Sequence, residues 1–128
     1  MPNNHQKTIV FIEDEPHLQE ELTAALVEEG YAIKNAYDGE AGLALILKEK
    51  PDLVLLDLIL PKKDGFEILE AIKQNPATKH IPIIVLSNLE TVENVDRAVS
   101  LGAAAYLVKP NYEIAHITEK IKNVLGNS

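Results

Sequence analysis

Hydrophobic and polar residues follow two patterns that take turns along the chain. Short runs rich in aliphatic and β-branched residues predict strands, whereas apolar residues three or four positions apart predict helices. The short runs cover residues 8–12, 31–37, 53–56, 81–86 and 104–108. The helical spacing covers residues 15–30, 40–49, 66–75, 91–101 and 112–125. The chain is therefore expected to alternate between strand and helix from one end to the other.

Apolar positions within each predicted helix indicate the face that packs on the rest of the molecule. In the helix over 66–75, the apolar positions are Ile68, Leu69 and Ile72. In the helix over 91–101, the residues expected to face inward are Val92, Val95 and Val99. Prolines and glycines stand at the predicted helix ends, as helix-starting and helix-stopping residues do.

Strict alternation of strands and helices favours an α/β fold, because parallel neighbouring strands need crossover connections. We expect a doubly wound parallel sheet of five strands with helices on both faces. At 128 residues and 46% hydrophobic composition, the chain is long enough for one domain with its own core. In such sheets ligands bind beyond the carboxyl ends of the strands.

Polar residues follow four of the five apolar runs at those carboxyl ends. They are Glu13, Asp14, Asp57, Ser87 and Lys109. If the four strands are neighbours, these side chains converge on one edge of the sheet. Asp57 is the most informative, because the run before it is short and wholly apolar, as in a strand that is buried on both faces. A turn with Pro61 and Asp64-Gly65 follows it.

Composition excludes several classes of function. The chain has no cysteine, which excludes thiol catalysis, disulfides and cysteine-ligated metals. A formal charge of −8 argues against direct nucleic-acid binding, which depends on lysine and arginine. No apolar stretch approaches the length of a membrane span, so we expect a cytoplasmic protein without membrane contact. Glycine-rich motifs of nucleotide-binding loops are missing from the sequence.

The polar residues at the strand ends suggest phosphoryl chemistry. The acids Glu13, Asp14 and Asp57 carry three negative charges and Lys109 one positive charge, which leaves an excess that a divalent cation can balance. Oxygen ligands favour a hard ion such as Mg²⁺. Such an ion, the Lys109 ammonium and the Ser87 hydroxyl can together bind the oxygens of a phosphoryl group. Asp57, ionised near neutral pH, could then serve as the nucleophile.

These motifs resemble the receiver domain of two-component response regulators, over roughly Lys7 to Leu125 and so over nearly the whole chain as a single domain, 1–128. The resemblance implies a flavodoxin-like sheet with strand order 2-1-3-4-5. It also implies a phosphoacceptor signalling module, in which Asp57 takes a phosphoryl group from a phosphohistidine on a histidine kinase or histidine phosphotransfer protein. Such a domain is regulatory and catalyses only its own phosphorylation and dephosphorylation.

The resemblance also implies roles for the other site residues. Asp14, Asp57, the backbone carbonyl of Ile59 and Glu13, directly or through water, would hold Mg²⁺. Lys109 would bridge Asp57 and the phosphoryl group, and the peptide bond between Lys109 and Pro110 is expected to be cis.

A switch is expected from the same resemblance. The Ser87 hydroxyl would bind the phosphoryl oxygen and Tyr106 would turn inward, although Tyr106 could also be a half-buried aromatic residue with a hydrated hydroxyl. The surface that changes would include Val95, Ala98, Tyr106 and Lys109. It would act on a downstream effector protein or domain, and the resemblance leaves a phosphorylation-dependent dimer open.

Three positions depart from the common pattern of that family. Ser87 replaces threonine and keeps the hydroxyl, and Glu13 stands where aspartate is frequent. Asn88 stands where a small residue is usual, so its side chain is expected to narrow access to Asp57 and slow phosphoryl exchange.

Two alternative functions remain open. A dehalogenase-like aspartyl phosphohydrolase would have a second aspartate two residues after Asp57, where this chain has Ile59. A non-cycling flavodoxin-like adaptor domain would have no need of the acidic and basic residues at the strand ends.

Overall fold

The computed structural model of the chain describes residues 6–109 and 113–126. Its strands are β1 (Thr8–Ile12), β2 (Ala32–Ala36), β3 (Leu53–Leu56), β4 (Ile83–Ser87) and β5 (Ala105–Val108). Its helices are α1 (Pro16–Glu28), α2 (Gly39–Glu49), α3 (Gly65–Gln74), α4 (Val92–Ser100) and α5 (Ile114–Val124). Every predicted element is present, and the ends differ by no more than two residues from the prediction. The predicted helix start at Tyr112 lies outside the described residues.

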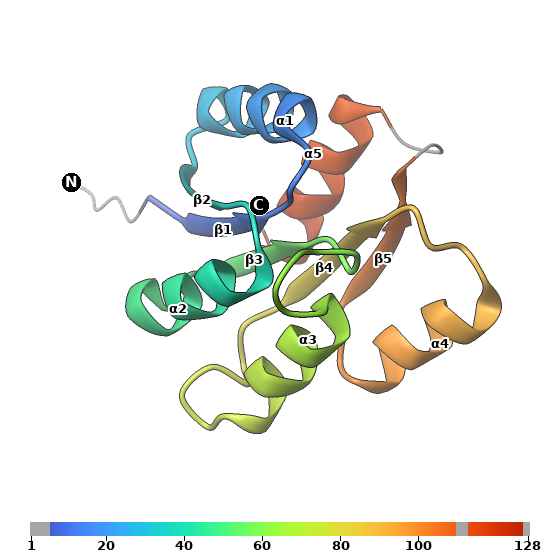
Figure 1. Cartoon of the computed structure of the whole chain (residues 1–128). Coiled ribbons are helices and arrows are strands. Elements are labelled where there is room, and N and C mark those ends of the chain that lie inside the picture. Colours follow the sequence, from blue (N-terminus) through green and yellow to red (C-terminus); the bar gives the residue numbers. More distant parts are fainter. Residues whose placement is uncertain (1–5, 110–112, 127–128) are drawn as a thin grey trace.

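The strands form one parallel sheet in the order β2-β1-β3-β4-β5. Helices α1 and α5 cover one face, and α2, α3 and α4 cover the other (Figure 1). The doubly wound fold and its strand order are thus confirmed. All five strands run in the same direction, so their carboxyl ends lie at one edge of the sheet.

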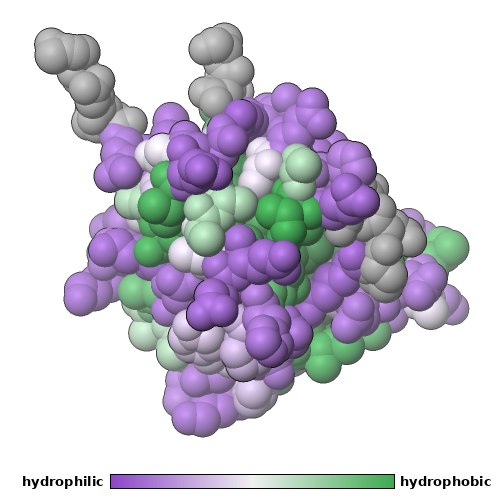
Figure 2. Space-filling model, turned by 90° about the horizontal axis from the view of Figure 1, so that it is seen from above, coloured by the Kyte–Doolittle hydropathy of each residue, from purple (hydrophilic) through white to green (hydrophobic). Residues whose placement is uncertain are grey.

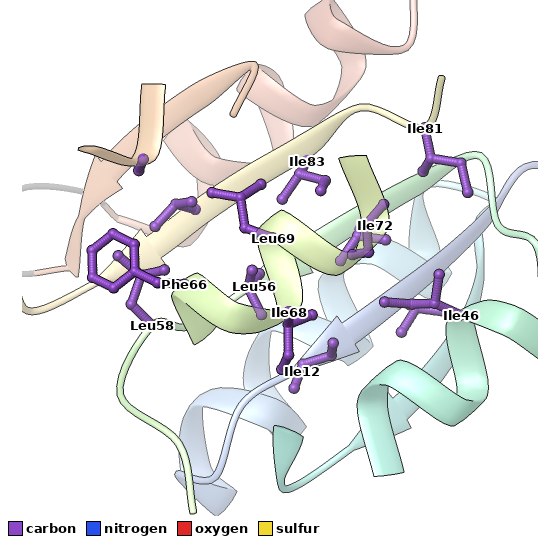
Figure 3. Packing of buried hydrophobic residues seen from close by; sticks show 14 of the residues in the cluster. Ile12, Ile46, Leu56, Leu58, Phe66, Ile68, Leu69, Ile72, Ile81 and Ile83 are labelled. Carbon is purple, nitrogen blue, oxygen red and sulfur yellow. The ribbon is translucent and has the colours of Figure 1, made fainter. Parts of the chain in front are cut away.

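Each face of the sheet has its own hydrophobic core. Beneath α2, α3 and α4, the side chains of Ile68, Leu69 and Ile72 pack on strand residues such as Leu56 and Ile83 (Figure 3). The cluster beneath α1 and α5 is built around other residues of the same strands. β3 contributes to both cores, since every residue from Leu53 to Leu56 is fully buried. Asp57 therefore follows a strand that is held firmly on both faces.

Helix α4 packs differently from the prediction. Val92 and Val99 are 72% and 53% exposed, so the prediction that they face inward was wrong. The helix contacts the core through Ala98, which is fully buried. Ala98, expected as part of the surface that changes on phosphorylation, is buried in this structure. Spacing locates an apolar stripe on a helix, but it does not determine which part of the helix circumference meets the sheet.

The outer surface is mostly polar where α1 and α5 cover the sheet, with smaller hydrophobic areas between polar residues (Figure 2). Among the described residues, no helix has both the length and the apolar character that crossing a membrane requires.

Candidate functional site

Three carboxylates meet at the carboxyl ends of two neighbouring strands. Glu13 and Asp14 follow β1, Asp57 follows β3, and each offers an oxygen within 4.8 Å of the others. Glu13 is fully buried and Asp57 is nearly so, whereas Asp14 is exposed to solvent. Buried carboxylates at this separation repel one another unless a cation or protons compensate their charge. The group therefore has the donor atoms and the excess negative charge that suit a hard divalent cation.

Lys109 reaches this acidic group from the end of β5. Its Nζ lies 2.9 Å from Glu13 Oε1 and 3.2 Å from Asp57 Oδ2. Burial acts to lower the pKa of Lys109, but contact with Glu13 and the charge of Asp57 outweigh it and raise that pKa above its ordinary value. The ammonium stays charged between two carboxylates. Pro110 lies outside the described residues, so the expected cis bond stays a prediction.

Glu13 has an unusual electrostatic environment. Burial raises its pKa to about 7, with the Asp57 charge acting in the same direction and Lys109 acting against both. Its Oε2 accepts a hydrogen bond from the Glu15 backbone N–H at 3.1 Å, while Oε1 faces Lys109. The sequence predicted Glu13 as a metal ligand but not its direct pairing with Lys109. Lys109 is therefore paired with Glu13 as well as with Asp57.

The loop between β3 and α3 holds Asp57 from the other side. The Ile59 N–H donates to Asp57 Oδ1 at 3.2 Å, and Asp64 caps α3 by accepting from the Phe66 N–H at 2.7 Å. Gly65 permits a close approach, because a Cβ there would lie only 2.6 Å from the Asp57 carbonyl oxygen. The Asp64-Gly65 turn is thus part of the geometry that shapes this loop.

Ser87 and Tyr106 lie together beside the acidic group. Ser87 is fully buried as the last residue of β4, and its hydroxyl accepts from the Leu89 N–H at 3.3 Å. The Tyr106 hydroxyl donates to the Leu89 carbonyl oxygen at 2.7 Å. Burial raises the pKa of Tyr106, and its contact with the Ser87 hydroxyl acts in the opposite direction. Tyr106 is therefore half-buried with a hydrogen-bonded hydroxyl, held on the loop that follows Ser87.

Asn88 is exposed at an opening next to Lys109. A cavity of about 350 Å³ lies there, between the start of α1 and the loop after β4. Its lining residues are Glu15, His17, Leu18, Glu21, Asn88 and Lys109. Asn88 thus stands where a molecule that approaches Lys109 through this cavity would pass.

Gln19 is a residue near the site that the sequence did not single out. It is 2% exposed and its side-chain amide contacts the backbone at the end of β1. The helical spacing could have indicated its burial, because position 19 lies next to Leu18 and three residues before Leu22, toward the apolar face of the helix. A glutamine there needs hydrogen-bond partners inside the protein.

Comparison with known proteins identifies the family that this chain resembles. A family model described as the response regulator receiver domain matches residues 9–122. The transcriptional regulatory protein HprR of Escherichia coli (strain K12) is 40% identical over 102 residues, which are 80% of this chain and 44% of that protein. The chain spans about half or less of the curated relatives it matches.

Solved structures of response regulators have a similar fold. A CheY-like response regulator receiver domain protein from Methanospirillum hungatei JF-1 has a TM-score of 0.89 and 30% identity, and the match covers 95% of each chain. The Mn²⁺-bound form of response regulator Rcp1 has a TM-score of 0.82 and 30% identity, and that match covers 95% of this chain and 96% of the other.

Proposed function

This chain belongs to the response regulator receiver domain family, and we propose on that premise that its Asp57 accepts a phosphoryl group from a phosphohistidine. The observation that carries the proposal is the position of Asp57. Its carboxylate is nearly buried, grouped with two other acids and 3.2 Å from the Lys109 ammonium. A domain that takes a phosphoryl group only onto its own aspartate does not need an enclosed pocket for a small-molecule substrate.

The transfer step follows from the chemistry of these residues. A carboxylate oxygen of Asp57 attacks the phosphorus atom while the bond from phosphorus to the histidine nitrogen breaks. The leaving imidazole keeps the electron pair, and the product on Asp57 is an acyl phosphate. Lys109 stabilises negative charge on the phosphoryl oxygens, and the Ser87 hydroxyl donates a hydrogen bond to one of them.

Mg²⁺ fits the donor set of the site. The donors are carboxylate oxygens from Glu13, Asp14 and Asp57, to which we add the backbone carbonyl of Ile59. The three carboxylates outnumber the single Lys109 ammonium that contacts two of them, so a cation there would relieve an excess of negative charge. When bound, the ion would neutralise negative charge on the phosphoryl oxygens. The Mn²⁺-bound form of Rcp1 supports the proposal of a divalent cation, because Rcp1 is a response regulator of similar fold.

We further propose that phosphorylation changes the surface formed by β5 and its neighbouring helices. Tyr106 supports this role, because its hydroxyl holds the loop that follows Ser87. Movement of the Ser87 hydroxyl toward a phosphoryl group would disturb that loop and shift the population of the Tyr106 side chain. The partners are a histidine kinase or phosphotransfer protein as donor and an effector protein or domain as target.

A phosphoryl analogue tests the proposal. Titration with beryllium trifluoride in the presence of Mg²⁺ should give saturable binding by calorimetry, and Asp57→Asn should abolish it. Asp52→Asn is the matched control, because Asp52 lies just before the other end of the same strand. Binding that persists in Asp57→Asn, or that is missing from the unaltered protein, would contradict the proposal.

Asn88 is proposed to slow phosphoryl exchange by narrowing the cavity next to Lys109. Asn88→Ala should speed phosphorylation of Asp57, loss of the phosphoryl group, or both. Asn94→Ala on α4 removes a similar side chain away from this cavity and serves as control. Equal rates for Asn88→Ala and the unaltered protein in both directions would refute this role.

A further inference from the structure

Gln19 is a buried polar residue that takes no part in the proposed phosphoryl transfer. It lies in the first turn of α1, is 2% exposed, and shares the inward face of that helix with the fully buried Leu22. A primary amide in such a place must have its hydrogen-bonding groups satisfied by the protein. The partners of the amide therefore show what this residue holds.

The Gln19 amide nitrogen lies within hydrogen-bonding distance of three backbone carbonyl oxygens at the ends of β1 and β2, which share its two N–H donors. Its Nε2 distances are 3.2 Å to Phe11, 3.0 Å to Glu13 and 2.8 Å to Ala36. Carbonyl oxygens can only accept, so the NH₂ group must face them. The amide oxygen faces the other way and accepts from the Asn35 side chain on β2. Neighbouring groups thus fix the orientation of the amide from both sides.

The contact with Glu13 bears directly on the acidic group. The Glu13 carbonyl belongs to the peptide unit that joins Glu13 to Asp14, and the orientation of that unit constrains the direction in which both side chains leave the backbone. The Glu13 N–H also donates to the Ala36 carbonyl oxygen at 3.0 Å. Both backbone polar groups of Glu13 are therefore tied, one through Gln19 and one to the end of β2.

We propose that Gln19 is a positioning residue, which holds the Glu13–Asp14 peptide so that both carboxylates face Asp57. The inference rests on the proposed function, in which these acids bind Mg²⁺. Residues that orient metal ligands through a hydrogen bond typically change metal affinity by about 10–100-fold when they are replaced. An effect of that size through a residue without metal contact distinguishes positioning from a general loss of stability.

The test compares Gln19→Met, which keeps the size of the side chain, with Thr78→Val. Thr78 is fully buried and its hydroxyl donates to the Ile72 carbonyl oxygen at 2.8 Å, away from the acidic group. Both variants should lower the melting temperature, but only Gln19→Met should raise the Mg²⁺ dissociation constant, by about 10-fold or more. Asn35→Ala, at an exposed position, should give a smaller rise. Equal dissociation constants for Gln19→Met and Thr78→Val would overturn the inference.

A second measurement separates this inference from the proposed function. In the metal-free protein, the NMR signals of the Glu13 carbonyl carbon and the Asp14 amide report the orientation of their shared peptide. Gln19→Met should shift both signals, whereas Thr78→Val should leave them in place. Unchanged signals in Gln19→Met would overturn the positioning role even if Mg²⁺ binds. If the unaltered protein does not bind Mg²⁺, the proposed function is contradicted. The two NMR signals then still test the positioning role of Gln19.

Discussion

Replacing Glu13 by glutamine should change how stability depends on pH. Burial raises the pKa of Glu13 from 4.5 to about 7, so the folded protein holds a proton that the unfolded chain releases. Below pH 4.5 the residue is protonated in both states. As the pH rises from 4.5 through about 7, first the unfolded chain and then the folded protein ionises at Glu13. The stability that the retained proton gives the folded protein is progressively lost over this range. Glu13→Gln stays neutral and avoids this loss.

The size of the effect follows from the same pKa. One pKa unit corresponds to about 1.4 kcal/mol, so a rise from 4.5 to about 7 corresponds to about 3 kcal/mol. Urea unfolding of both proteins across this range gives two curves of free energy against pH. The stability of Glu13→Gln relative to the unaltered protein should increase by about 3 kcal/mol from below pH 4.5 to above pH 7.

Thr78→Val provides the control for this experiment, since it removes a buried hydrogen bond without removing a titrating group. Its stability relative to the unaltered protein should stay constant over the same range. A constant difference for Glu13→Gln, or one that shrinks as the pH rises, would refute the assignment of a raised pKa to Glu13.

Two further substitutions, with Gly42→Ala as a comparison, test the structure around the site. Gly65→Ala should lower the free energy of unfolding by at least about 2 kcal/mol and slow phosphorylation, because its Cβ would lie 2.4 Å from the backbone of the preceding loop. Gly42→Ala should cost less, since its nearest neighbours are Ile12 side-chain atoms at 2.5 Å; equal losses in denaturant unfolding would contradict this reasoning. Tyr106→Phe should cost about 1 kcal/mol in the same assay by removing the hydrogen bond to the Leu89 carbonyl oxygen, and an unchanged stability would refute that contribution.

The elements of the fold could be predicted because each has a strong local signal. The run from Leu53 to Leu56 is wholly apolar and short, so both its strand character and its burial followed from the sequence. The convergence of Glu13, Asp57 and Lys109 followed from the rule for parallel sheets, given neighbouring strands. The strand order itself came from the family resemblance and not from any pattern of residues.

Features that depend on contacts between elements could not be predicted in the same way. The exposure of Val92 and the burial of Ala98 depend on how α4 is rotated against the sheet. The pairing of Glu13 with Lys109 depends on the length of two side chains from separate strands. The proposed role of Gln19 depends on the backbone carbonyl groups at the ends of β1 and β2, and sequence spacing carries no information about them.

The most direct test of the central claim is to locate the phosphoryl group by mass spectrometry after reaction with phosphoramidate, whose bond between phosphorus and nitrogen resembles that of phosphohistidine. With Mg²⁺ present, we expect one phosphoryl group on Asp57, none in Asp57→Asn, and normal labelling of Asp52→Asn. A phosphoryl group on another residue, or no labelling of the unaltered protein, would contradict the account.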